Sequence, residues 1–296
     1  MMSKILLTGA AGHMGKFALD TLLASGKVAP GDIVATTRDP KKLADYAAKG
    51  VEVRAADFDK PETLVTAFAG IDRLAIISTD AVDGTDKRLK QHLAAVAAAE
   101  KAGVKHIIYT SMPKPETSVI PFAPDHLGTE QAIKATGIAH TILRVSWYQE
   151  NLLQSLPQAL GSGQWFTSAE DGKIAYIARD DAARTVAAVL LADNNDSATY
   201  TLTGPELNTS AEIAALASDV TGKPIAIVPV SDAQLGEGLK QAGLPAPVIG
   251  LVVAIDTNTR QGGLDVQTDA VEKLTGTKPQ PVRKFLEDHK AALLGA

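Results

Sequence analysis

The sequence contains no cysteine, which excludes disulfide bridges, thiolate metal sites and a cysteine nucleophile. It also lacks any run of about 18 uncharged apolar residues, so no membrane-spanning helix is expected. The 29 basic and 34 acidic side chains show no basic surplus of the kind that nucleic-acid-binding proteins carry. Apolar residues at 45% and charged residues at 21% are ordinary for a globular chain. We therefore expect a cytoplasmic, enzyme-sized protein with neither nucleic-acid nor membrane partners.

Short apolar runs alternate with helical patterns through the first half of the chain. Strands are expected at 5–8, 33–36, 51–53, 74–78, 106–111 and 141–145, and helices at 61–69, 86–101 and 129–135. Strands that alternate with helices indicate βαβ units with right-handed crossovers. The fold class predicted here is α/β, with a doubly wound parallel sheet.

The alternation becomes irregular after about residue 150. Helices are expected at 151–160, 179–191, 209–220, 231–241, 245–259 and 281–294, and short strands at 199–202 and 225–230. The second half is therefore predicted to be a smaller, mostly helical lobe. We place the boundary between 1–150 and 151–296, with the chain re-entering the first domain near 179–203.

The strongest motif is a glycine-rich turn that directly follows the first strand and opens the first helix. It reads Thr8-Gly9-Ala10-Ala11-Gly12-His13-Met14-Gly15. Glycine allows a tight turn, lets the backbone approach a pyrophosphate and lets a helix pack closely on a strand. The N-terminus of the helix then offers free N–H groups to phosphate oxygens. A plain strand-to-helix turn is the alternative, but the position of the motif favours a Rossmann domain that binds a dinucleotide.

The end of the second strand indicates which dinucleotide is bound. An acidic side chain there would hold the ribose 2′-hydroxyl of NAD. Asp39 is acidic, but its place before Pro40 already explains it as a helix cap. Arg38 is suited to a 2′-phosphate and to stacking on adenine, and Lys42 would add charge one turn later. This pattern favours NADPH over NADH.

Seven segments of the chain form a familiar set, namely Thr8–Gly15, Thr37–Lys42, Arg54–Phe58, Gly103–Ser111, Gly137–Arg144, Trp147–Tyr148 and Glu150–Asn151. Together they resemble one family, the NmrA-like atypical short-chain dehydrogenase/reductases. The likeness spans nearly the whole chain and is greatest to the branch of bacterial NAD(P)H:quinone oxidoreductases and triphenylmethane dye reductases. It implies that Asp57 and Phe58 flank the adenine. It also implies that Ser78 and Thr79 lie along the ribose and pyrophosphate, and that Ser111 and Ser146 belong to the cofactor site.

The chain departs from ordinary short-chain enzymes at their proton donor. Those enzymes use a Tyr-x-x-x-Lys pair that a serine assists. Ser111 stands where that serine is expected. Here Phe122 stands in the tyrosine slot and His126 in the lysine slot, and Glu130 follows. A missing general acid typically costs about 10²–10⁴-fold in rate. A quinone tolerates this loss, because hydride addition to it forms a delocalised aromatic anion that takes a proton from water.

Several candidate residues remain with open roles. His126 either donates a hydrogen bond or proton, or has no proton role at all. Trp147 and Tyr148 are aromatic candidates for stacking on the acceptor, with core packing as the alternative, and Asn151 would order that segment. The histidines show no metal-ligand spacing, so no metal is expected.

The combined expectation is an oxidoreductase that uses NADPH, or less favourably NADH, and neither flavin nor metal. It would transfer hydride directly to a quinone or dye-like acceptor, as a monomer or homodimer. One alternative is a redox sensor of the NmrA type that binds nucleotide without turnover. Another is a reductase of the isoflavone-reductase type, although those enzymes carry a lysine where His126 stands. The sequence does not identify the physiological acceptor.

Overall fold

A computed structural model describes residues 3–81 and 85–295 of the chain. The contacts divide into two compact units. Unit 1 runs to Met112 and also includes Pro124–Arg144 and Asp180–Tyr200. Unit 2 comprises Pro113–Ala123, Val145–Arg179 and the chain from Thr201 onward. The boundary expected at residue 150 stays a prediction, because compactness of contacts does not test independent folding.

Unit 1 is built on a seven-stranded sheet in the order β3-β2-β1-β4-β5-β6-β9. The strands are β1 (Ile5–Leu7), β2 (Ile33–Thr37), β3 (Glu52–Ala55), β4 (Arg73–Ile76), β5 (His106–Ser111), β6 (Ala139–Val145) and β9 (Ala198–Leu202). From β3 to β6 every neighbouring pair is parallel. The expected α/β class with a parallel, doubly wound sheet is confirmed. Since the order reverses direction between β1 and β4, their carboxyl ends form the opening where such sheets bind ligands.

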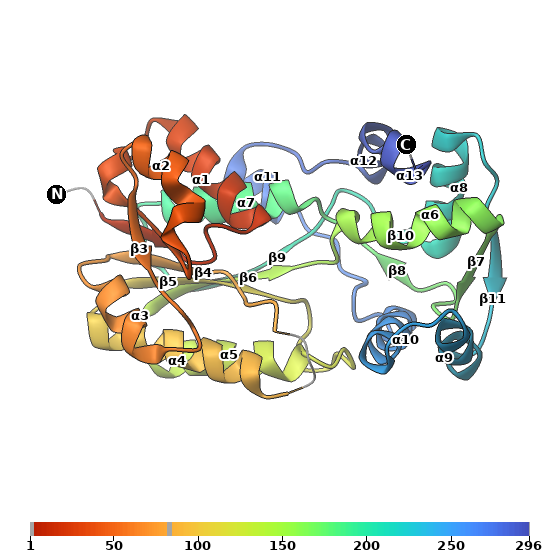
Figure 1. Cartoon of the computed structure of the whole chain (residues 1–296), viewed down its shortest axis with the longest axis horizontal. Helices are drawn as coiled ribbons and strands as arrows, with labels where there is room; N and C mark the ends of the chain where they lie inside the picture. The colour runs from red at the N-terminus through yellow and green to blue at the C-terminus, as the bar shows by residue number, and fades with distance from the viewer. Residues whose placement is uncertain (1–2, 82–84, 296) are drawn as a thin grey trace. The chain divides into compact units, whose positions relative to one another are not determined.

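Helices cover both faces of this sheet (Figure 1). One face carries α1 (His13–Ser25), α2 (Ala44–Ala48) and α7 (Arg179–Leu190), and the other carries α3 (Pro61–Phe68), α4 (Lys87–Ala102) and α5 (Ala123–Ala135). Two short 3-10 helices, η1 (Pro30–Asp32) and η2 (Pro40–Leu43), flank β2. Between the sheet and α3–α4, the apolar side chains of Leu6, Phe68, Leu74 and Ile107 are fully buried. Burial on both faces explains why these strands read as continuous apolar runs.

Arg73 fastens the segment after α7 to the sheet. Its guanidinium is buried, with only 4% of the residue exposed. It donates to the carbonyl oxygens of Val189 at 2.9 Å and Asn194 at 3.0 Å, and to Oδ1 of Asn195 at 3.0 Å. These hydrogen bonds offset the cost of burying the guanidinium. Residues 180–200 are therefore an integral part of unit 1.

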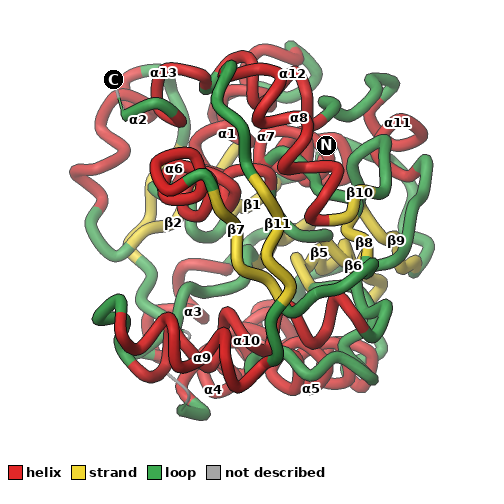
Figure 2. The backbone as a smooth tube through the Cα atoms, turned by 90° about the vertical axis from the view of Figure 1, so that its right-hand side faces the viewer, coloured by secondary structure: helices red, strands yellow, loops and turns green. Residues whose placement is uncertain are grey.

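Unit 2 is mostly helical, as expected, and contains two small sheets. The strands β7 (Gln164–Thr167) and β11 (Ala226–Pro229) pair in parallel, and β8 (Lys173–Ile174) pairs antiparallel with β10 (Asn208–Thr209). The helices are η3 (Gln149–Asn151), α6 (Leu152–Ser162), α8 (Ser210–Thr221), α9 (Asp232–Gln241), α10 (Ala246–Arg260), α11 (Ala270–Thr275), α12 (Val282–Asp288) and α13 (Lys290–Leu293). Helices α6 and α8 lie on one side of the β7–β11 pair, and α9 and α10 on the other (Figures 1 and 2).

The helix starts of unit 2 follow their sequence signals. Helix α8 begins with a capping box. Thr209 Oγ1 accepts from the Glu212 N–H at 3.2 Å, and the Glu212 carboxylate accepts from the Thr209 N–H at 2.7 Å. Ser231 and Gln234 form a second box at α9. Each box satisfies two amide donors that the helix itself leaves unpaired.

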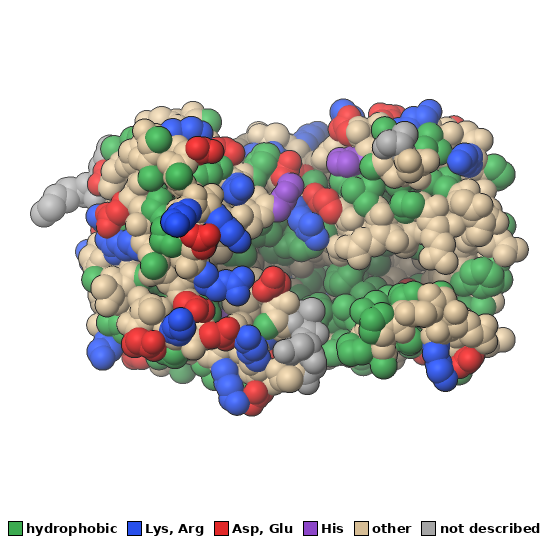
Figure 3. Space-filling model, viewed as in Figure 1, with side chains coloured by type: hydrophobic (Ala, Val, Ile, Leu, Met, Phe, Trp, Pro, Cys, Tyr) green, Lys and Arg blue, Asp and Glu red, His purple; other side chains and the backbone are tan. Residues whose placement is uncertain are grey.

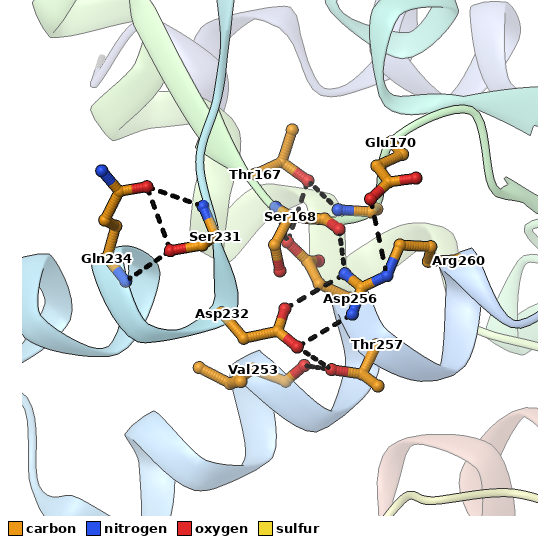
Figure 4. A network of polar contacts seen from close by, with 11 residues as sticks. Thr167, Ser168, Glu170, Ser231, Asp232, Gln234, Val253, Asp256, Thr257 and Arg260 are labelled. Carbon is orange, nitrogen blue, oxygen red and sulfur yellow. Dashed lines mark hydrogen bonds and ion pairs between the residues drawn. The ribbon is translucent and has the colours of Figure 1, made fainter.

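A polar network joins α9, α10 and the end of β7 (Figure 4). Asp256 Oδ2 accepts from the Thr167 hydroxyl and from the Ser168 N–H, both at 2.8 Å. Arg260 donates to both carboxylate oxygens of Asp232, at 3.1 and 2.8 Å. Burial raises the pKa of Asp256 above its ordinary value, against the opposing effect of these two hydrogen bonds. The two helices are thus fastened to the strand by polar contacts rather than by apolar packing alone.

The surface of each unit has a different character in Figure 3. Acidic and basic side chains are interspersed over the part of unit 1 that carries α1, α2 and α3, whereas hydrophobic side chains gather over α10 in unit 2. Val248 of α10 is 42% exposed. None of the helices in the described chain is both long and apolar enough to cross a membrane.

Candidate functional site

The glycine turn after β1 can be built only with glycine at its key positions. Gly9 has φ +61°, which places it in the left-handed region. A Cβ on Gly15 would lie 2.3 Å from the Gly9 carbonyl oxygen and 2.6 Å from Ala10 Cα. The Gly12 N–H closes the turn by donating to the Gly9 carbonyl at 3.0 Å. The first turn of α1 can therefore pack against the end of β1 at backbone distance.

The N-terminus of α1 is open for an anion. No side chain of the described residues caps it, so its first-turn N–H groups lack the usual protein partner. His13, the first residue of the helix, places Nε2 3.2 Å from Oδ1 of Asp180, and both side chains are largely exposed. Ala11 and Met14 are half-buried beside the turn. This arrangement fits a pyrophosphate, which would accept hydrogen bonds from the helix amides.

The turn is joined to the end of β4, the neighbouring strand. Thr8 is fully buried, and its Oγ1 accepts from the Ile77 N–H at 3.0 Å. Ser78 donates its N–H to Thr110 Oγ1 at 2.8 Å, which joins the loop after β4 to β5. The structure thus brings together the glycine turn, Ser78 and Thr79 at the carboxyl ends of adjacent strands, where a dinucleotide would bind.

The end of β2 presents basic side chains to solvent. Arg38 and Lys42 are both exposed. The cap expected at Asp39 is present, because its Oδ1 accepts from the Lys41 N–H at 3.1 Å ahead of the 3-10 helix that Pro40 begins. Asp39 is therefore occupied with its own turn. Arg38 and Lys42 are the exposed basic side chains beside that turn.

The loop after β3 is held by its own side chains. Asp57 Oδ1 accepts from the Asp59 N–H at 3.1 Å, and Thr63 Oγ1 accepts from the Asp57 N–H at 3.0 Å. Phe58 packs, partly buried, against the apolar core of unit 1. The pKa of Asp59 is lowered chiefly by hydrogen bonds from neighbouring side chains, with the charge of Arg38 as a smaller cause. Arg38 and the Asp57–Asp59 loop are thus electrostatic neighbours.

Ser111 at the end of β5 is tied to a buried carboxylate. Glu130 is fully buried, and its Oε1 accepts from the Ser111 hydroxyl at 2.6 Å. Arg144 donates to both oxygens of Glu130, at 2.9 and 2.7 Å, and Lys134 lies 3.5 Å away. Both carboxylate oxygens of Glu130 therefore accept from Arg144, and Oε1 also accepts from Ser111. Ser111 therefore keeps lone pairs for a ligand donor, but its own proton is directed to Glu130.

His126, whose proton role the sequence left open, has protein partners at both ring nitrogens. It is 3% exposed, on α5, and Arg88 donates to its Nε2 from 2.9 Å. Its Nδ1 lies 2.8 Å from the Tyr109 hydroxyl. Burial, and secondarily the Arg88 charge, hold the pKa of His126 well below its ordinary value. The neutral imidazole engages both nitrogens within the protein, so the geometry favours the alternative of no proton role.

Sequence reasoning missed the buried polar cluster around His126, which consists of Arg88, His92, Tyr109 and Thr129. A signal was present in α4. Arg88 and His92 are spaced i, i+4 and share the buried face of this helix with Ala95 and Ala99. Polar side chains on an otherwise apolar helix face indicate a buried network that must be satisfied internally.

The candidate acceptor residues lie in unit 2. The Arg179 guanidinium lies 5.0 Å from the ring centroid of Tyr148, and its amino group donates to Asn151 Oδ1 at 3.4 Å. Trp147 packs, partly buried, against the apolar core of this unit, as the core-packing alternative requires. Ser146 Oγ is buried and has no hydrogen-bond partner within the described part of the chain. An orphaned buried hydroxyl is suited to a ligand group.

No group of three or more metal-ligating side chains occurs among the residues that the structure describes.

The family model for the NmrA-like family matches residues 1–282. Quinone oxidoreductase 2 of Escherichia coli K12 is 35% identical over 272 residues, which cover 92% of this chain and 93% of that protein. The crystal structure of an NADPH-dependent quinone oxidoreductase from E. coli with NADPH matches with a TM-score of 0.90 and 33% identity, over 96% of this chain and 99% of that one. Triphenylmethane reductase of Citrobacter sp. with NADP(H) matches with a TM-score of 0.88 and 35% identity, over 96% and 99% of the two chains.

Proposed function

Since the chain belongs to the NmrA-like family, we propose that it is an NADPH-dependent oxidoreductase that reduces a quinone or a similar conjugated electrophile. The solved relatives named as quinone and triphenylmethane reductases support this substrate class. We further propose that it works without flavin or metal, in the cytoplasm, as a monomer or homodimer.

The observation that carries the proposal is the open glycine turn at the β1–β4 edge of unit 1. Gly15 can approach the Gly9 carbonyl only because it has no Cβ, and no capping side chain at Gly12 bonds to the first-turn amides of α1. This turn would hold the pyrophosphate of a dinucleotide, with Ser78 and Thr79 along its other side.

The reducing power would come from the bound cofactor, which carries a hydride at C4 of its nicotinamide ring. The protein would bind and orient the two reactants, since near-attack contact supplies much of the acceleration in such reactions. Ser111 would accept a hydrogen bond from a ligand amide, because its own proton is directed to Glu130. Reduction of a quinone needs no positioned acid, which agrees with the neutral, internally bonded His126.

Preference for NADPH is proposed to rest on Arg38. A charge-assisted hydrogen bond to the 2′-phosphate is worth about 1.5–3 kcal/mol, so Arg38→Ala should raise the KM for NADPH by roughly 10–100-fold. The KM for NADH should change little, because NADH has no 2′-phosphate. Lys101→Ala, an exposed basic residue in the last turn of α4, is the matched control and should leave both constants unchanged. An Arg38→Ala enzyme that keeps its preference for NADPH would refute this role.

The first measurement is NADPH oxidation, followed at 340 nm with a panel of small quinones, on protein free of flavin and metal. Turnover that depends on quinone supports the proposal. Loss of turnover in Tyr148→Ala, with retention in Tyr148→Phe, would place the acceptor on the Tyr148 ring. Tight NADP(H) binding without turnover on any quinone would favour the redox-sensor alternative instead.

A further inference from the structure

The loop after β4 has backbone groups that the sheet cannot satisfy, and side chains from α4 satisfy them. Thr79 lies beyond the end of β4 at Ile76. Its N–H donates to His92 Nε2 at 3.0 Å, and its carbonyl accepts from Arg88. Arg88 and His92 are one helical turn apart, so the two side chains hold Thr79 from both sides.

Three further side chains hold Arg88 and His92 in place, all within unit 1. His126 of α5 accepts from Arg88 at 2.9 Å, and Tyr109 of β5 lies 2.8 Å from the other nitrogen of His126. His92 Nδ1 lies 3.1 Å from Thr129 Oγ1 and 3.3 Å from the Tyr109 hydroxyl. The His92 and Tyr109 rings meet edge to face, with centroids 5.5 Å apart.

The chemistry of the donors sets the direction of the hydrogen bonds to Nε2 of both histidines. A guanidinium and a backbone amide can only donate, so Nε2 must accept in both His126 and His92. A neutral imidazole then carries its proton on Nδ1. His126 donates to Tyr109, and His92 donates to Thr129 or Tyr109. Protonation of either ring would place one donor against another, which agrees with the pKa of His92 at about 3, lowered by burial and then by Arg88.

We propose that Arg88 and His92 are positioning residues for the cofactor, with His126 and Tyr109 orienting them. The inference rests on the proposed function, because it assumes that the dinucleotide lies along Thr79. The start of this loop is bonded to the glycine turn through the Ile77 N–H and Thr8 Oγ1, so a shift of the Thr79 backbone would move the loop relative to the turn that holds the pyrophosphate. Because hydrogen bonds hold both the N–H and the carbonyl of Thr79, they restrict the position of this loop more closely than aliphatic packing would.

His92→Phe tests the proposal, because it preserves the ring and removes the acceptor for Thr79. An unsatisfied buried amide costs enough to raise the KM and Kd for NADPH about tenfold or more, while kcat at saturating NADPH stays within about threefold of wild type. His92→Gln places an amide oxygen near the former Nε2 and should restore most of the affinity. His106→Phe is the matched control. His106 is also a buried histidine, bonded to Thr141 at 2.9 Å, but it begins β5 at the opposite end from Thr79.

Affinity for NADPH is read from its fluorescence on binding, which requires no turnover. If the wild-type protein binds NADPH and the Kd of His92→Phe is the same, this inference alone is overturned. That comparison requires no measurement of turnover. Binding without quinone reduction would overturn the proposed reaction and leave the comparison of Kd values intact. A wild-type chain that binds neither NADPH nor NADH would overturn both.

A second measurement holds even where the phenylalanine variant fails to fold. Nitrogen-15 spectra of the wild-type protein should show His92 and His126 as Nδ1–H tautomers at pH 5.5 and at pH 8. The Nε2–H tautomer at either residue, or titration between these pH values, would overturn the assigned network.

Discussion

At residue 15 one methyl group decides whether the glycine turn can close. A Cβ at this position meets the Gly9 carbonyl oxygen at 2.3 Å, which no small adjustment of a side chain relieves, because the obstacle is backbone. Gly15→Ala should therefore destabilise the fold by about 1–3 kcal/mol or more and abolish binding of NADPH. Chemical denaturation and NADPH fluorescence measure the two effects.

Gly161→Ala is the control for this prediction. Gly161 lies in α6, and no described atom outside its own helix comes within 4 Å of its ideal Cβ. Alanine in an open helix position should stabilise the fold by about 0.5–1 kcal/mol. Equal effects of the two substitutions would contradict the steric argument.

The buried histidines predict acid sensitivity. Burial, as the largest cause, lowers the pKa of His92 to about 3 and of His106 to about 4 from an ordinary 6.5, and lowers that of His126 well below it. Below pH 6.5 these histidines bind protons in the unfolded chain but stay neutral in the folded one. The free energy of unfolding therefore keeps its full value above pH 6.5 and falls as the pH is lowered toward 4. Each histidine contributes up to about 1.4 kcal/mol per pH unit in this window.

Urea unfolding at closely spaced pH values measures this slope. His106→Gln retains a side-chain amide for Thr141 and should reduce the slope by about one proton between pH 6 and pH 4.5. A slope that is the same in wild type and variant would show that His106 titrates normally in the fold.

At the scale of single residues, the sequence predicted those features whose partners lie a few residues away along the chain. The glycine turn and the Asp39 cap could be predicted because they are local. The burial of His126 could not be predicted, because its partners Arg88 and Tyr109 come from α4 and β5. Sequence spacing does not show which residues of separate elements come into contact. The orphaned hydroxyl of Ser146 is likewise a property of the folded surroundings.

At the scale of elements, the network in Figure 4 predicts how α10 is held. Both hydrogen bonds to Asp256 end on one oxygen, Oδ2, which the amide oxygen of asparagine can replace. Asp256→Asn should therefore change the free energy of unfolding by less than about 1 kcal/mol, because it also removes a buried charge. Asp256→Ala should cost about 2–4 kcal/mol by leaving the Thr167 hydroxyl and the Ser168 N–H without an acceptor.

Thermal denaturation of the two variants at pH 7.5 separates these effects. If Asp256→Asn destabilises the protein as much as Asp256→Ala, the charge of Asp256 rather than its acceptor oxygen holds the helix. The exposed Asp219, whose Arg283 partner is also on the surface, offers a control substitution that should cost less than about 1 kcal/mol.

Elements that alternate regularly along the chain were predictable, and three strands outside that alternation were not. The strand expected at 106–111 is β5 as observed, and the helix expected at 179–191 is α7. The strands β7, β8 and β10 were missed, because they lie in the irregular second half, where no regular alternation with helices marks them. Helix α5 begins at Ala123 rather than at 129, with Pro124 in its first turn, where proline is tolerated.

At the scale of the whole molecule, the path of the chain predicts that a fragment ending at residue 150 does not fold by itself. A fragment of 1–150 would lack α7 and β9, and it would leave the buried Arg73 guanidinium without its acceptors at Val189, Asn194 and Asn195. We expect this fragment to aggregate or to unfold without a cooperative transition, as judged by circular dichroism on heating. A cooperative transition near that of the full chain would instead support 1–150 as an independent domain.

The late position of β9 also has a consequence for synthesis. Strand β9 closes the free edge of β6, but it is encoded about 55 residues after β6 ends at Val145. At about 5–20 residues per second, a ribosome needs roughly 3–11 s to make that stretch. During this interval the nascent chain exposes an unpaired parallel edge strand, the kind of surface that chaperones and neighbouring polypeptides on a polysome encounter. The rate of translation across residues 146–198 should therefore influence the yield of native protein.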